Sequence, residues 1–123
     1  MRTWITVCDT CNRPETNPTE GDGSDGARLA ELVERAALGK GEVRRFSCLM
    51  GCARACNVTV QAAGKIGYTL VEFQPTPEDA AAIADYAELH QESKTGQVPY
   101  RQWPQGVKGH FATRHPILPD PGP

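Results

Sequence analysis

Five cysteines are the residues of this chain best suited to carry chemistry, and they fall into two groups. Cys8 and Cys11 are separated by two residues, and Cys48, Cys52 and Cys56 follow one another at intervals of four. Thiols grouped this closely can form disulfides, bind a zinc ion, act as a redox dithiol or hold an iron–sulfur cluster.

The composition of the chain bears on whether its cysteines form disulfides. The 123 residues are 39% hydrophobic and 23% charged, with a net charge of −2, which predicts one domain with an ordinary core and argues against general nucleic-acid binding. No membrane-spanning run is present, and the first residues lack the apolar stretch of a signal peptide. We therefore expect a cytoplasmic protein with reduced thiols, in which an odd number of grouped cysteines favours a metal or catalysis over disulfides.

Hydrophobic patterning predicts an α/β fold with the element order β-α-β-β-β-α. Strands are expected at residues 3–7, 42–46, 57–62 and 68–73, and helices at 27–38, capped by Ser24 or Asp25, and after Thr76. A strand, a helix and a strand in succession form a right-handed parallel crossover, and the next two strands form a hairpin. This is a thioredoxin-like arrangement over residues 1–95. Residues 96–123 are rich in proline and are expected to form an irregular C-terminal tail that wraps the domain.

The predicted crossover explains why the two cysteine groups can meet. Parallel strands 3–7 and 42–46 would end at one edge of the sheet, with Cys8 and Cys11 after the first, and Cys48 and Cys52 after the second. Four thiolates there could hold tetrahedral zinc or an iron–sulfur cluster. The C-x3-C spacing is wider than a usual zinc knuckle, and Gly51 before Cys52 lets the backbone pass close to a bulky cluster.

Two other kinds of site are less favoured by the sequence. Cys8-x2-Cys11 after a first strand resembles a thioredoxin motif, but a loop over residues 12–26 separates it from the helix that would lower a thiol pKa. The three histidines, His90, His110 and His115, have no Cys-x-His neighbour and are expected at the surface, so a Rieske-type site is disfavoured.

Several stretches carry a resemblance to known families. "VCDTC", "CLMGCARAC", "YTLVEFQPTPEDAAAIADYA" and "TRHPIL" together resemble the DUF1636 family of predicted metal-binding proteins over nearly the whole chain. Residues 3–92 also resemble the thioredoxin-like [2Fe–2S] ferredoxins, which include a small subunit of NADH dehydrogenase.

The ferredoxin resemblance implies a ligand set. Cys8 matches the first ligand of the ferredoxins, and Cys48 and Cys52 match their C-x3-C pair. Cys11 would be the second ligand, although the ferredoxins have a longer gap there. Cys56 stands near a Gly-Pro or Ala-Pro of the ferredoxins and is a reserve ligand, so the fourth ligand is open between Cys11 and Cys56. A [4Fe–4S] cluster and zinc are the alternative cofactors.

Three functions follow from these expectations. The first is a non-enzymatic [2Fe–2S] electron carrier, the second a structural zinc-binding adaptor, and the third a protein that delivers a metal or cluster. Residues 93–119 contain no acid, and we expect them to be a solvated tail or to contact an acidic redox partner or a twin subunit in a homodimer. The bases in this segment are Lys94, Arg101, Lys108 and Arg114. No nucleic-acid or membrane partner is expected.

Overall fold

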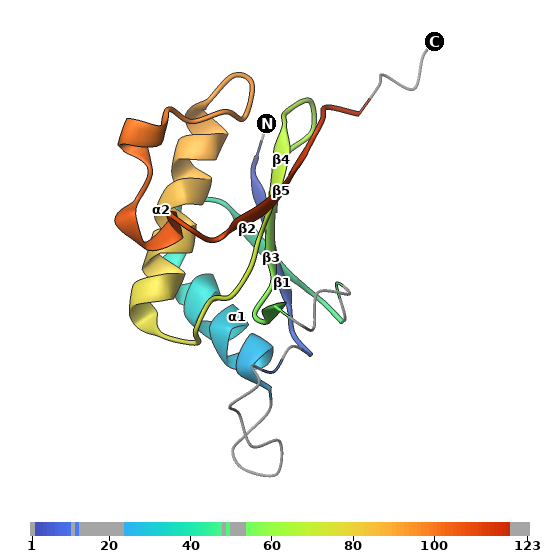
Figure 1. Cartoon of the computed structure of the whole chain (residues 1–123), viewed down its shortest axis with the longest axis vertical. Coiled ribbons are helices and arrows are strands. Elements are labelled where there is room, and N and C mark those ends of the chain that lie inside the picture. The colour runs from blue at the N-terminus through green and yellow to red at the C-terminus, as the bar shows by residue number, and fades with distance from the viewer. Residues whose placement is uncertain (1, 11, 13–23, 48, 50–53, 119–123) are drawn as a thin grey trace.

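A computed structural model of the chain describes residues 2–10, 12, 24–47, 49 and 54–118. It contains one mixed five-stranded sheet with both α-helices on the same face (Figure 1). The elements in chain order are β1 (Trp4–Cys8), α1 (Asp25–Ala36), β2 (Glu42–Phe46), β3 (Val58–Gln61), β4 (Gly67–Leu70), α2 (Pro77–Glu92) and β5 (Phe111–His115). The sheet order is β2-β1-β3-β4-β5, with β1 and β2 parallel and the other pairs antiparallel. The predicted α/β class and β-α-β-β-β-α order are confirmed.

Both helices begin at side chains that cap them. The Ser24 hydroxyl accepts a hydrogen bond from the amide of Ala27 at 3.0 Å, which settles the choice between the two predicted caps of α1. The Thr76 hydroxyl accepts one from the amide of Asp79 at 3.2 Å, and Pro77 occupies the first helical position of α2 as expected. Within the described residues, no helix is long and apolar enough to cross a membrane.

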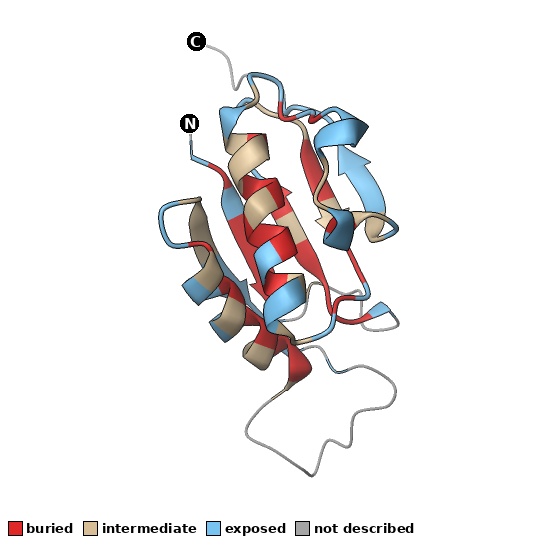
Figure 2. Ribbon diagram, turned by 90° about the vertical axis from the view of Figure 1, so that its left-hand side faces the viewer, coloured by how far each residue is buried: buried red, intermediate tan, exposed pale blue. Residues whose placement is uncertain are grey.

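The two faces of the sheet have different environments. Ile5 and Val7 of β1 pair with Val60 and Val58 of β3, and all four side chains are fully buried on the face covered by the helices. Figure 2 colours much of the central strands, and parts of both helices that cover them, as buried. Because side chains alternate along a strand, Trp4 points to the opposite face, which neither α1 nor α2 covers.

The tail differs from the expectation of irregular structure. Two short 3-10 helices, Tyr100–Gln102 and Gln105–Val107, precede β5, and the second packs against α2. Phe111–His115 then forms a fifth strand beside β4, so the prediction of irregular structure was wrong for these residues. The sequence signal was dominated by flanking prolines, whereas the strand depends on pairing with the distant edge of β4.

His90 also differs from its prediction. Its side chain is fully buried near the end of α2, so the expectation of a surface position was wrong. Nε2 lies 2.7 Å from the carbonyl of Ile66, and Nδ1 lies 2.7 Å from the hydroxyl of Thr3. Since a carbonyl can only accept, Nε2 donates to Ile66. In the neutral imidazole that burial favours, Nδ1 then accepts from the Thr3 hydroxyl. Its spacing of seven residues from buried Ile83 was the signal for this helix face.

We expect the free energy of unfolding to fall as the pH drops from 7 to 5. Burial lowers the pKa of His90, the backbone hydrogen bond to Ile66 opposes this, and the charge of Lys65 adds to it. Below about pH 6.5 the unfolded chain binds a proton that the folded chain resists, so stability is lost towards acid and becomes level below the folded pKa. Thermal unfolding midpoints of the wild type and His90→Gln, measured from pH 5 to 8, would test this. The difference between the two proteins should shrink towards pH 5, and a constant difference would contradict the role of His90.

Candidate metal centre

Cys8 is the last residue of β1, and its side chain lies on the sheet face opposite α1 and α2. By alternation its side chain shares this face with Trp4 and Thr6, yet the residue is fully buried. The backbone amide of Leu49 donates to the Sγ atom of Cys8 at 3.4 Å, and the Thr10 hydroxyl lies 3.6 Å from the same sulfur. The segment that follows β2 therefore reaches the Cys8 thiol.

The ends of β1 and β2 are held together at this edge. Cys8 pairs with Phe46 in the parallel ladder, and the amide of Asp9 donates to the carbonyl of Phe46 at 3.3 Å. The Ser47 hydroxyl donates to the carboxylate of Asp9 at 3.1 Å. Residues next to Cys48 on both sides, Ser47 and Leu49, thus contact the segment that carries Cys8. Cys11, Cys48 and Cys52 themselves, together with Gly51, lie outside the described residues.

Asp9 and Asn12 contact the start of α1. The Ser24 hydroxyl donates to the carbonyl of Asp9, and the Asn12 side-chain oxygen accepts from the amide of Asp25 at 3.0 Å. The sequence places a long loop between Asn12 and the helix, but in space Asn12 contacts the first turn of α1. Backbone amides and the dipole at a helix N-terminus stabilise a nearby thiolate.

Cys56 lies at the same end of the sheet, just before β3. It is fully buried, and its backbone exchanges hydrogen bonds with that of Phe73, at 3.2 and 3.4 Å. The amide of Cys8 donates to the carbonyl of Asn57 at 3.1 Å, which extends the β1–β3 pairing to the residue next to Cys56. The burial of Cys56 agrees with the expectation of a packed thiol. Its neighbour Asn57 is hydrogen-bonded to Cys8, so Cys56 lies near Cys8.

These contacts fit a thiolate-bound centre. A buried sulfur that accepts a backbone amide hydrogen bond is the environment in which proteins tune iron–sulfur thiolates. Among the described residues, no three His, Cys, Asp or Glu side chains come together to bind a metal ion. The three other cysteines of the expected ligand set lie outside that part of the chain, so the full set is an expectation from sequence.

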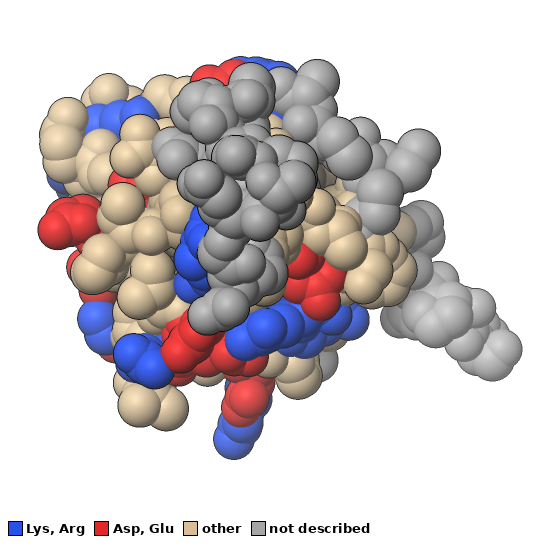
Figure 3. All heavy atoms as spheres, turned by 90° about the horizontal axis from the view of Figure 1, so that it is seen from below, with Lys and Arg blue, Asp and Glu red and all other residues tan. Residues whose placement is uncertain are grey.

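Charges of both signs surround this end of the molecule. Figure 3 views it from below and shows acidic and basic side chains interspersed around the residues that are not described. Arg45 pairs with Glu34 at 2.7 Å, and Arg54 pairs with Glu72 at 2.8 Å. Such exposed pairs contribute little stability, so we assign them no role in holding a metal.

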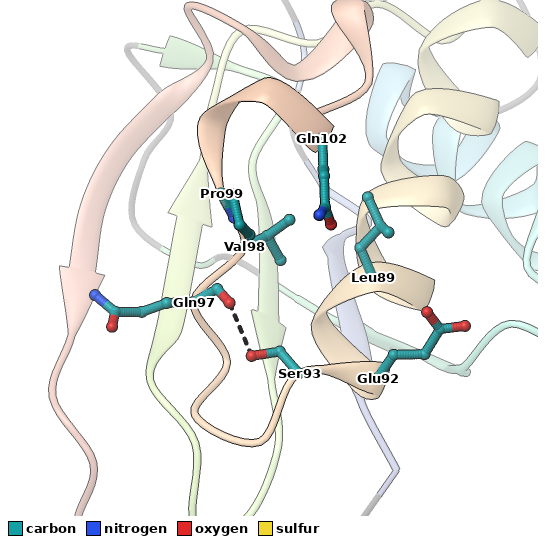
Figure 4. A pocket seen from close by; sticks show the side chains of 7 residues that line it. All are labelled: Leu89, Glu92, Ser93, Gln97, Val98, Pro99 and Gln102. Atoms are coloured by element: carbon teal, nitrogen blue, oxygen red, sulfur yellow. Dashed lines mark hydrogen bonds between the residues drawn. The ribbon is translucent and has the colours of Figure 1, made fainter.

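A concave feature lies at the C-terminal end of α2. A cavity of about 220 Å³ lies between the end of this helix and the segment after it (Figure 4). The Ser93 hydroxyl on its wall donates to the carbonyl of Gln97 at 2.8 Å. Because β1 and α2 end at opposite sides of the molecule (Figure 1), this cavity is not part of the cysteine site.

A family model described as "Protein of unknown function (DUF1636)" matches residues 5–117. The chain belongs to the DUF1636 family. The match includes all five cysteines, both α-helices and, apart from Trp4 at the start of β1, all five strands, so the expected family is confirmed. Searches of curated proteins and of solved structures gave no significant match. Metal binding and the likeness to ferredoxins stay predictions for this DUF1636 chain.

Proposed function

We propose that this protein is a small cytoplasmic electron carrier that holds a [2Fe–2S] cluster. The observation that carries the proposal is the hydrogen bond from the Leu49 amide to the buried sulfur of Cys8. It joins the neighbourhoods of the two cysteine groups at one sheet edge, which is what a ligand set drawn from both groups requires. The proposed ligands are Cys8, Cys11, Cys48 and Cys52, with Cys56 in reserve.

The role of the chain in this proposal is to hold and tune the cluster. The cluster, when bound, supplies one-electron transfer, and no bond-making step is assigned to the protein. Burial of Cys8 keeps water from its sulfur, and the Leu49 amide stabilises negative charge on it. Hydrogen bonds join Asp9 and Asn12 to Ser24 and Asp25 at the start of α1.

We expect the protein to be red-brown when it is purified without oxygen. Clusters of iron and sulfide absorb visible light and lose much of that absorption on reduction, whereas zinc thiolates are colourless. Visible spectra before and after dithionite, with iron and sulfide analysis, provide the measurement. Equal amounts of iron and sulfide and bleaching by dithionite are expected. Colourless protein with stoichiometric zinc would replace the electron carrier with the zinc adaptor, and the iron count would distinguish a [4Fe–4S] cluster.

A further inference from the structure

The face of β1 and β2 opposite α1 and α2 exposes two large aromatic side chains, Phe46 at the cysteine edge and Trp4 at the other end of β1. Trp4 is 41% exposed and Phe46 is 57% exposed. The parallel register pairs Thr6 with Arg44 and Cys8 with Phe46, so these side chains alternate onto the same face as Trp4. We call Trp4, Arg44 and Phe46 the aromatic–arginine face. Tryptophan, phenylalanine and arginine are enriched where proteins bind one another.

Arg44 is held in position by Thr6 and Trp4 rather than by an acidic partner among the described residues. Its Nε donates to the Thr6 hydroxyl at 2.7 Å, and its guanidinium carbon lies 5.9 Å from the centre of the Trp4 ring. The nearby Arg2 and Arg45 pair with glutamates, but within the described part of the chain no carboxylate pairs with Arg44. Because the side chain is already ordered, a carboxylate that binds its remaining N–H groups meets a reduced entropic cost.

The position of this face relative to Cys8 suits electron transfer. Phe46 is the ladder partner of Cys8, and neighbouring strands lie about 4.8 Å apart. By contrast β5, which carries Arg114, is three strands away from β1, or about 14 Å. Trp4 and Phe46 lie four residues apart in register, about 13 Å, which fits the small interfaces of transient redox encounters.

We propose that the aromatic–arginine face docks an acidic protein that exchanges electrons with the centre at Cys8, a proposal that rests on the electron-carrier function. A carboxylate of the partner pairs with Arg44, and an apolar side chain of the partner packs on Phe46. The charge complementarity comes from Arg44, with which no carboxylate of the described residues pairs, since Glu42 on the same face pairs with Arg2. The two aromatic residues supply apolar area on either side. The basic tail after α2 is the competing docking site.

The test uses a short synthetic peptide in which a leucine is flanked by glutamates, and a counterpart with glutamines. Each is titrated into the isotope-labelled, anaerobically purified protein at low salt and followed by NMR. The indole N–H of Trp4 and the Nε–H of Arg44 are the reporters. The acidic peptide should shift both signals in a saturable way, and the glutamine peptide should not. Shifts confined to residues 93–118, or equal shifts with both peptides, would overturn the proposal.

Variants make the test specific to this face. Arg44→Gln and Phe46→Ser should each weaken binding of the acidic peptide about tenfold, the factor that corresponds to 1.4 kcal/mol. Arg35→Gln is the matched control, because Arg35 is an exposed arginine on α1 that pairs with Glu31, and it should leave binding unchanged. Equal weakening by Arg44→Gln and Arg35→Gln, with binding unchanged in the uncharged replacement Phe46→Ser, would show attraction by net charge alone and would contradict a docking face.

The outcomes separate this proposal from the function on which it rests. A red-brown protein that fails to bind the acidic peptide at Trp4 and Arg44 would overturn the docking face and leave the electron carrier standing. A colourless protein that binds the peptide there would retain an acidic partner at this face and remove the electron exchange from the proposal.

Discussion

Replacement of Cys8 by serine is expected to remove most of the visible absorption and most of the bound iron. The Cys8 sulfur is fully buried at the end of β1 and accepts the Leu49 amide, so it is placed to be a ligand from the first cysteine group. A serine hydroxyl is a poorer ligand for iron than a thiolate and stays protonated at neutral pH. Visible spectra and iron content of the anaerobically purified variant are the measurements, and a wild-type spectrum would remove Cys8 from the ligand set.

The same substitution at Cys56 is the control. Its hydrogen bonds with Phe73 are made by the backbone and are retained in Cys56→Ser, so we expect the wild-type spectrum. Burial of the new hydroxyl should lower the free energy of unfolding by about 1–3 kcal/mol. Cys11→Ser, Cys48→Ser and Cys52→Ser should each lose or shift the spectrum. If Cys56→Ser loses the cluster while Cys11→Ser keeps it, the fourth ligand is Cys56 and the assignment taken from the ferredoxins is wrong.

The elements that the sequence predicted well are those with local signals. β2 has the predicted bounds of Glu42–Phe46, and α2 begins after Thr76 with Pro77 at its first position. A cap, a proline and a run of β-branched or aromatic residues are read within a few neighbours. β5 escaped prediction because what makes it a strand is its pairing with β4, about 45 residues earlier in the chain.

In the candidate site, too, some contacts could be predicted from the sequence and others could not. The parallel crossover predicted that the segments after β1 and β2 would meet, and the contact of Leu49 with Cys8 agrees with that expectation. The contact of Asn12 with Asp25 could not be predicted, because it spans a loop whose length suggests separation from the helix. The aromatic–arginine face needed the β1–β2 register, since a shift of one residue would place Arg44 on the other face.

The substitution Gly96→Ala is the second for which we expect a large effect, here a loss of stability. Gly96 contacts Ile66 and His90, which are distant in the chain. Gly96 has a φ of +88°, and an added Cβ would lie 2.5 Å from the carbonyl oxygen of Ile66 and 2.9 Å from Nε2 of His90. His90 Nε2 donates a hydrogen bond to this carbonyl oxygen of Ile66. The amide of Ile66 in turn donates to the carbonyl of Thr95 at 2.9 Å. The methyl group would therefore separate the β3–β4 hairpin from the end of α2. We expect the free energy of unfolding to fall by about 3–5 kcal/mol, measured by urea unfolding.

The variant Gly64→Ala separates the backbone strain of a positive φ from the steric clash of the added Cβ, the two causes of the loss in Gly96→Ala. Gly64 has a similar φ of +74°, but no atom lies within 4 Å of an added Cβ. It should therefore lose only the backbone cost of a left-handed alanine, about 1–2 kcal/mol. The excess in Gly96→Ala then measures the contact among Gly96, Ile66 and His90. Equal losses in the two variants would show that the hairpin moves aside at little cost, and would contradict the view that His90 is held rigidly by the Ile66 carbonyl.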